Sequence, residues 1–159
     1  MVRLVTLLTL CVVVLLAPLR AQDSANPNRE RRQLEVNLTL ARRAAFDRVL
    51  ATFTAEEIPI ANANSEGGVV VAGPVEISHF GALKDNAFFR ATLIAIDSAT
   101  TRVYLSATFV SNSDAAWRGA ATGVGSQAQE EVVTSKNKGD KGKVWKRVQQ
   151  LAERIRTGA

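Results

Sequence analysis

The stretch FFRATLIAIDSATTRVYLSATF, Phe88–Phe109, decides the fold of this chain. Apolar residues alternate with polar or bulky ones on both sides of the turn-forming segment Asp97–Thr101. Alternation with a period of two residues on either side of a turn predicts an antiparallel β-hairpin. One face of this hairpin is apolar and the other is mixed, so we expect a sheet that is covered on one face and partly hydrated on the other. The apolar face consists of Phe89, Ala91, Leu93, Ala95, Val103, Leu105, Ala107 and Phe109.

Two segments outside the hairpin have the 3.6-residue period of amphipathic helices. For the first helix we expect Thr39 as the N-cap and Pro59 beyond the end. Its apolar positions are Phe46, Val49, Leu50 and Phe53. The second helix covers Lys143–Arg156, with Asp140 as the expected N-cap and Gly158 after the end. Its apolar positions are Val144, Val148, Leu151, Ala152 and Ile155, with Trp145 beside them.

Shorter patterns between these elements predict further strands. Glu57–Ala61 suits an edge strand because it contains proline, which lacks the N–H that a central strand needs. The turn formers of Asn62–Gly68 then lead into the β-branched strand Val69–Ala72, and the Gly-Pro pair that follows bends or ends that strand. We expect Val75–Asn86 to be a loop or an irregular continuation, and Gln129–Thr134 to supply one more short strand.

Together these elements predict an α+β fold. It is a two-layer domain in which an N-terminal and a C-terminal helix pack on one face of an antiparallel sheet of about four strands. The domain covers residues 36–156 and contains a long flexible loop over residues 111–142, which is rich in Ser, Ala, Gly, Gln and Lys. Residues 22–35 are too polar to bury apolar surface, and we expect them to form a disordered tether.

Residues 1–21 have the order of features typical of a secretory signal peptide. Arg3 supplies the positive charge, Leu4–Leu16 is the apolar run, and the small residue Ala21 precedes a polar region. The alternative, an uncleaved membrane anchor, needs about 20 apolar residues, whereas this run ends before Pro18. We therefore expect export to the periplasm or the exterior, with cleavage near Ala21.

The sole cysteine, Cys11, lies inside the apolar run rather than at its end, where a bacterial lipoprotein carries its lipid-bearing cysteine. Cleavage near Ala21 would therefore leave a mature chain without cysteine. This excludes disulfide scaffolds, thiol nucleophiles and cysteine-ligated zinc sites as functions of the mature chain.

The chain has a net charge of +5, and the excess of basic residues is concentrated in Lys136–Arg156. This cluster suits a solvated linker and helix start, or contact with an anionic membrane surface or an acidic partner. We expect no nucleic-acid partner, because no aromatic residue alternates with the lysines that precede Lys143 and because export removes the chain from nucleic acid.

No motif predicts catalysis, and we expect neither a cofactor nor a metal. His79 is the only histidine, and its neighbour Ser78 is not part of a nucleophile elbow. The carboxylate pairs Glu56–Glu57 and Glu130–Glu131 are adjacent in sequence, so their side chains diverge. The glycines of Gly119–Gly125 lack the lysine of a phosphate-binding loop.

Three residues are candidates for contact with a partner or ligand: Trp117, Arg90 and Tyr104. Trp117 is an aromatic residue within the long loop, where it either anchors a partner or folds back onto the sheet edge. Arg90 and Tyr104 belong to the mixed face of the hairpin.

The succession of the Phe46–Phe53 helix, a hairpin around Ser65–Gly68, the Phe88–Phe109 hairpin and a final helix with Trp145 resembles small exported bacterial domains of the helix-grip type. One such domain is the C-terminal domain of the outer-membrane assembly lipoprotein BamC. The resemblance covers residues 36–156 and rests on element order and apolar spacing. It implies an envelope protein without a known reaction.

The sequence therefore predicts an exported, non-enzymatic binding module whose partner is an envelope protein or lipid. A carrier of small molecules or lipids, with a pocket between the first helix and the sheet, is the alternative, because Ala91, Ala95 and Ala107 are small. A hydrolase is the third hypothesis.

Overall fold

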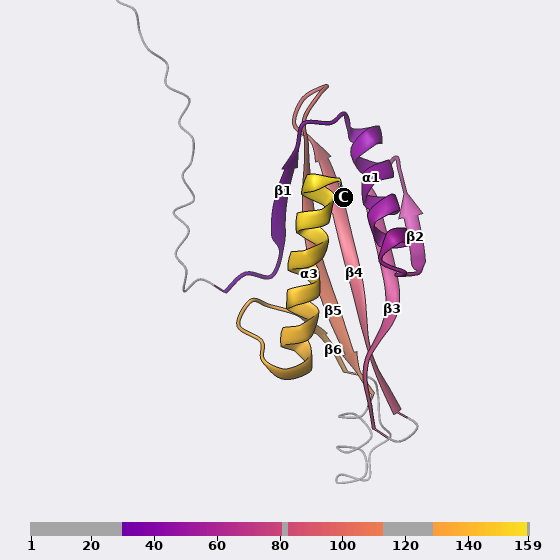
Figure 1. Ribbon diagram of the computed structural model, residues 1–159, viewed down its shortest axis with the longest axis vertical. Coiled ribbons are helices and arrows are strands. Elements are labelled where there is room, and N and C mark those ends of the chain that lie inside the picture. Colours follow the sequence, from indigo (N-terminus) through magenta and orange to yellow (C-terminus); the bar gives the residue numbers. More distant parts are fainter. Residues whose placement is uncertain (1–29, 81–82, 113–128, 159) are drawn as a thin grey trace, which may run out of the picture.

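The computed structural model describes residues 30–80, 83–112 and 129–158 (Figure 1). The elements in chain order are β1 (Leu34–Leu38), α1 (Arg42–Ala55), β2 (Ile60–Asn64), β3 (Val69–Phe80), β4 (Leu83–Ala95), β5 (Thr101–Ser111), β6 (Gln129–Val132) and α3 (Gly139–Thr157). The strands form one antiparallel sheet, and both helices lie on the same face of it (Figure 1). The predicted α+β class is thus confirmed.

The hairpin predicted over Phe88–Phe109 is formed by β4 and β5. Ala91 is paired with Leu105 and Phe89 with Ala107, so the apolar positions of the two strands share one face. This face is buried, with Leu93 3% and Leu105 1% exposed. Ala95, at the end of β4, is the apolar position that lies exposed instead.

The sheet has six strands rather than about four, in the order β1-β5-β4-β3-β2, with β6 also paired with β5. β1 and β6 share the outer edge of β5: β1 pairs with its first half, where Leu34 faces Leu105, and β6 with its second half, where Val132 faces Thr108. The first element is therefore a strand and not a helix. Leu34 and Glu35 belong to this strand, although their sequence position predicts a tether.

The first helix begins later than its sequence predicts. Thr39 is not its N-cap, because Leu38 is still paired with Thr101 in the sheet and α1 begins at Arg42, after Ala41. The apolar face is as expected: Phe46 is 4% exposed and Phe53 is completely buried.

The region after α1 is more regular than its sequence predicts. β2 is displaced towards the C-terminus, so Asn62 and Asn64 are strand residues and the turn is limited to Ser65–Gly68. Of the two alternatives expected for Val75–Asn86, the loop is wrong and the irregular continuation is what the structure has: β3 continues to Phe80 with shifts in register, and β4 begins at Leu83. A shift in register between Ala72 and Val75 accommodates Pro74, and β3 is paired with β4 on both sides of it.

The expected flexible loop over residues 111–142 contains regular structure at both ends. Ser111 ends β5, Gln129–Val132 forms the short strand predicted near this position, and α3 begins at Gly139. Asp140 is not the N-cap; Lys138 precedes the helix, and Asp140 lies in its first turn. Gly158 ends the helix with φ 75°, a left-handed conformation that glycine adopts without strain.

The core is a single cluster between the two helices and the sheet. Both helices contribute one apolar stripe to it, and the five buried residues of α3 include Trp145. The expected signal peptide, residues 22–29 of the expected tether and Trp117 lie outside the described residues.

Candidate functional site

The face of the sheet opposite the helices is the candidate interaction surface. Along β5, buried residues alternate strictly with half-buried ones, because the helices cover one face and no described helix covers the other. The open face, as we call it, has at its centre Val69, Val71, Phe88, Arg90, Thr92, Ile94, Arg102, Tyr104, Ser106 and Thr108. It therefore joins aromatic, aliphatic and arginine side chains on one surface.

The strand register brings two of the predicted contact residues together on the open face. Arg90 is paired with Ser106, and Thr92 is paired with Tyr104. Arg90 and Tyr104 are consequently diagonal neighbours on adjacent strands, a separation of about 7–8 Å that long side chains bridge. Phe88 lies on the same face two residues before Arg90.

The two arginines of the open face differ in their surroundings. The Nε atom of Arg102 lies 2.9 Å from a carboxylate oxygen of Glu35 and 3.0 Å from the amide oxygen of Asn37. A hydrogen bond with the Tyr104 side chain, followed by the Glu35 charge, raises the pKa of Arg102 above its ordinary value. Arg90 is exposed and has no ion-pair partner among the described residues. It is therefore the cation of this face that is open to a partner.

A second polar cluster lies at the end of the sheet on the helix side. The buried carboxylate of Asp85 accepts hydrogen bonds from the Ser78 hydroxyl at 3.1 Å, the Ser111 hydroxyl at 3.2 Å and the backbone N–H of Asn112 at 2.9 Å. These bonds join β3, β4 and β5 where the strands end. Because both hydroxyls donate to it, the carboxylate is satisfied as a structural acceptor.

His79 lies in β3, paired with Lys84 across the strands. Within the described ranges, no group of three or more His, Cys, Asp and Glu side chains is arranged to hold a metal ion.

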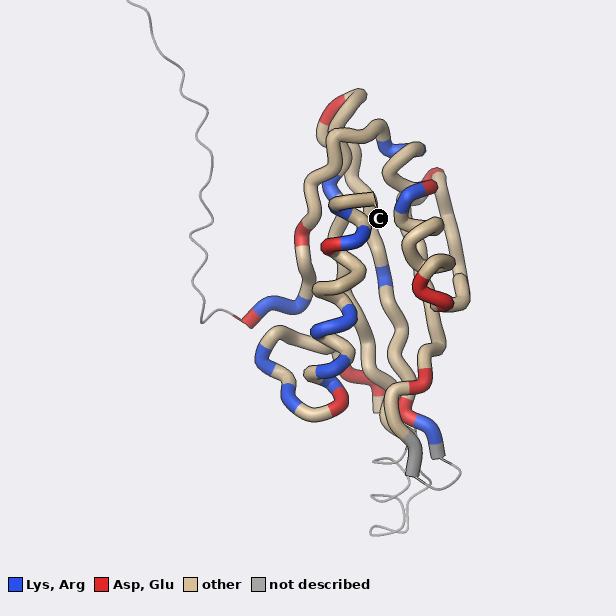
Figure 2. Tube along the Cα trace, viewed as in Figure 1, with Lys and Arg blue, Asp and Glu red and all other residues tan. Residues whose placement is uncertain are grey.

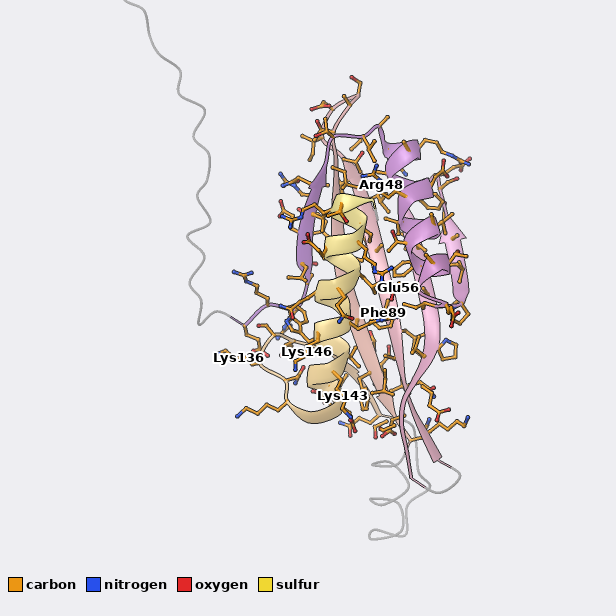
Figure 3. The ribbon with its side chains drawn as sticks, viewed as in Figure 1. Arg48, Glu56, Phe89, Lys136, Lys143 and Lys146 are labelled. Atoms are coloured by element: carbon orange, nitrogen blue, oxygen red, sulfur yellow. The ribbon has the colours of Figure 1, made fainter. Side chains whose placement is uncertain are left out.

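Of the pair Glu56 and Glu57, Glu56 has a structural role that the sequence does not reveal. The Glu56 side chain, 7% exposed, lies between two arginines of α3, 2.5 Å from Arg147 and 2.6 Å from Arg154. Charges of opposite sign therefore face each other where the end of α1 approaches α3 (Figures 2 and 3). The sequence indicates this contact only through the seven-residue spacing of Arg147 and Arg154, which places both arginines on one face of α3.

The sequence pattern does not assign Val69 and Val71 to the open face. A short run of valines has no alternation, so the sequence does not indicate which members face the helices. The pairing of Val71 with Arg90 decides it.

The sequence matches no protein-family model and no curated protein. Neither helix of the described chain combines the length and the hydropathy that crossing a bilayer requires.

Proposed function

We propose that this chain is an exported, non-enzymatic binding module of the cell envelope and that its open face holds a protein partner. The observation that supports this proposal is the composition of an uncovered sheet face. Phe88, Tyr104 and two arginines are residue types enriched at protein interfaces. Ile94, 49% exposed, adds apolar surface beside them.

The envelope location rests on the N-terminal sequence pattern. A basic residue, an apolar run and a small residue near Ala21 form the arrangement that secretion signals share. N-terminal sequencing of the protein recovered from the periplasmic or extracellular fraction tests this part, and we expect the mature chain to begin at Gln22.

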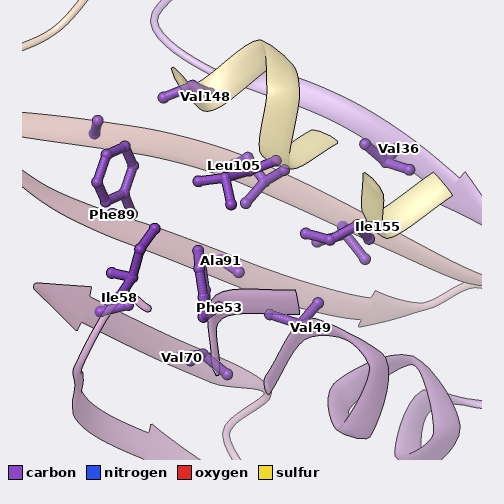
Figure 4. Packing of buried hydrophobic residues seen from close by; sticks show 14 of the residues in the cluster. Val36, Val49, Phe53, Ile58, Val70, Phe89, Ala91, Leu105, Val148 and Ile155 are labelled. Atoms are coloured by element: carbon purple, nitrogen blue, oxygen red, sulfur yellow. The ribbon is translucent and has the colours of Figure 1, made fainter. Parts of the chain in front are cut away.

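The packing of the core favours the binding module over the carrier. The carrier hypothesis requires space above the small residues of the sheet. Phe53 of α1 lies beside Ala91 in the core (Figure 4), and both are completely buried. A large helix side chain above a small strand side chain is how close-packed layers are filled.

Site-specific photo-crosslinking in the cells that express the native chain tests the proposed interface. A benzoylphenylalanine probe replaces Thr92 or Ser106 on the open face, and the matched control replaces Gln149, which is exposed on α3. We expect the same protein to crosslink from both open-face positions and not from Gln149. Arg90→Glu should reduce the yield, whereas Arg43→Glu, on the exposed side of α1, should not.

Three outcomes would contradict the proposal. Crosslinks of equal yield from Gln149 would show that the open face has no special role. Lipids or small molecules that copurify with the chain and are identified by mass spectrometry would support the carrier instead. Turnover in a hydrolase screen that Asp85→Asn abolishes, in a variant that stays folded, would support the hydrolase.

A further inference from the structure

Two segments that are far apart in the sequence meet beside α3. The backbone N–H of Arg31 donates to the Ser135 hydroxyl at 2.9 Å, and the backbone N–H of Ser135 donates to the Arg31 carbonyl, also at 2.9 Å. This double link places the basic segment before β1 next to the basic segment between β6 and α3. The sequence alone separates these segments by 104 positions.

The link assembles a local excess of positive charge, which we call the basic corner. It consists of Arg31, Arg32, Lys136, Lys138 and Lys146, all of them exposed. Figure 2 shows these basic positions gathered where the described chain begins and α3 starts, and Figure 3 shows Lys136 and Lys146 on the same side of α3.

None of the five has an ion-pair partner among the residues that the structure describes. Neighbouring lysines differ from them in this respect. Lys141 lies 2.5 Å from Glu131, and Lys143 lies 2.7 Å from Asp140, so the nearby carboxylates of Glu131 and Asp140 are already paired. Glu30, next to Arg31 in the chain, adds one negative charge beside the corner.

We propose that the basic corner binds the surface of an anionic phospholipid bilayer. The charges are complementary, and each Lys or Arg near such a surface strengthens binding about fivefold. Among the residues that the structure describes, the corner offers no exposed aromatic side chain on which a nucleic-acid base stacks, because Trp145 is buried. Lysine ammonium groups on flexible stems suit mobile lipid headgroups better than a fixed bidentate ligand.

The position of the corner in the chain also favours a bilayer. The sequence leads from the apolar run, which ends at Leu16, to Glu30 over 14 positions, a reach of at most about 50 Å. Until the cleavage near Ala21 that belongs to the proposed function, a membrane that holds the apolar run of the precursor therefore lies within reach of the corner. The corner shares no residue with the open face, so this inference does not depend on the proposed protein partner.

Vesicle co-sedimentation of the chain from Gln22 to Ala159 tests the inference. This chain contains every described element, and it lacks the apolar run that would bind lipid by itself. The vesicles consist either of phosphatidylcholine alone or of phosphatidylcholine and phosphatidylglycerol in equal amounts. We expect binding to the anionic vesicles only, and we expect it to weaken as the salt concentration rises.

A matched pair of triple variants separates the corner from the net charge. The variant Lys136→Gln/Lys138→Gln/Lys146→Gln should weaken binding to anionic vesicles by about 100-fold, since each cation contributes about fivefold. The control Arg43→Gln/Lys84→Gln/Arg156→Gln removes the same charge from exposed ion pairs elsewhere and should weaken it by less than about fivefold. Circular dichroism verifies that both variants are folded.

Three results would overturn the inference. The first is an unmodified chain that binds both vesicle types equally or neither. The second is an equal loss of binding in the two triple variants. The third is tight, corner-dependent binding to duplex DNA without binding to anionic vesicles, which would assign the corner to a nucleic acid.

Discussion

The carboxylate of Glu56, which follows the last residue of α1, lies 2.5 Å from the guanidinium of Arg147 on α3. Arg147 also donates to the Glu56 carbonyl at 3.3 Å, and Arg154 contacts the other carboxylate oxygen. One residue thus fixes the end of the first helix against two turns of the last helix. The helices therefore hold each other in place above the sheet through a polar contact at the edge of an apolar core.

Replacement of Glu56 should weaken the contact between α1 and α3 and so destabilise the fold. We expect Glu56→Gln to lower the free energy of unfolding by about 1–3 kcal/mol, because it leaves two arginines without their buried carboxylate. The loss stays below that of a fully buried pair because Arg147 and Arg154 are 39% and 50% exposed and regain hydration. Urea denaturation measures it, with Glu153→Gln as the control, since the pair of Glu153 with Arg156 is exposed and contributes less than about 1 kcal/mol. Equal losses in the two variants would contradict this role.

Gly73, the one glycine of β3, should tolerate substitution poorly. Its φ is 127°, and a Cβ atom there would lie 2.7 Å from the Ala87 carbonyl oxygen on the neighbouring strand. We expect Gly73→Ala to lower the free energy of unfolding by about 3 kcal/mol or more, from backbone strain together with this clash. Gly139→Ala is the matched control, since Gly139 also has a positive φ, 60°, but faces open space, and it should lose only about 1 kcal/mol. A Gly73→Ala variant as stable as this control would show that the strand relaxes around the clash.

The buried Asp85 should act as an acceptor that holds three strands together. We expect Asp85→Asn to lower the free energy of unfolding by about 1–3 kcal/mol, because an amide nitrogen then faces at least one of the donors Ser78, Ser111 and Asn112. Ser78→Ala removes one bond and should lose about 1 kcal/mol. Chemical denaturation compares the two, and a larger loss for Ser78→Ala would contradict this assignment.

Asp97 in the β4–β5 turn should make the hairpin sensitive to acid. The Ala99 backbone N–H, which donates to Asp97 at 2.7 Å, and the Thr100 side chain lower the pKa of Asp97. Since the lowered pKa belongs to the folded state, its stabilising effect is complete above the ordinary value of about 3.9 and is lost as the pH falls through the lower folded value. We expect the stability difference from Asp97→Asn to vanish over that acidic range.

An NMR titration of the Asp97 carboxyl group provides the direct measurement. Titration at or above the ordinary aspartate pKa would contradict the assigned hydrogen bonds.

The hairpin and the helices are predictable from the sequence because the periodicity that determines each of them lies within one continuous segment. The alternation around Asp97 fixes both strands of the hairpin and their buried face, and the 3.6-residue spacing of Phe46 and Phe53 fixes one helix. Gly158 ends the last helix because its missing side chain permits a left-handed conformation. The assignment of Arg90 and Tyr104 to the partly exposed face follows from the same alternation.

The remaining features depend on partners that are distant in the sequence, and only the tertiary structure decides them. Leu34–Leu38 is a strand because β5 offers an unpaired edge to it, and that pairing also delays the start of α1 beyond Thr39. The same holds for Glu56, whose arginines lie on another helix, and for the basic corner, which exists because Arg31 bonds to Ser135. Contacts with distant segments stabilise a short strand or fix a charged side chain. The periodicity of one segment does not predict such contacts.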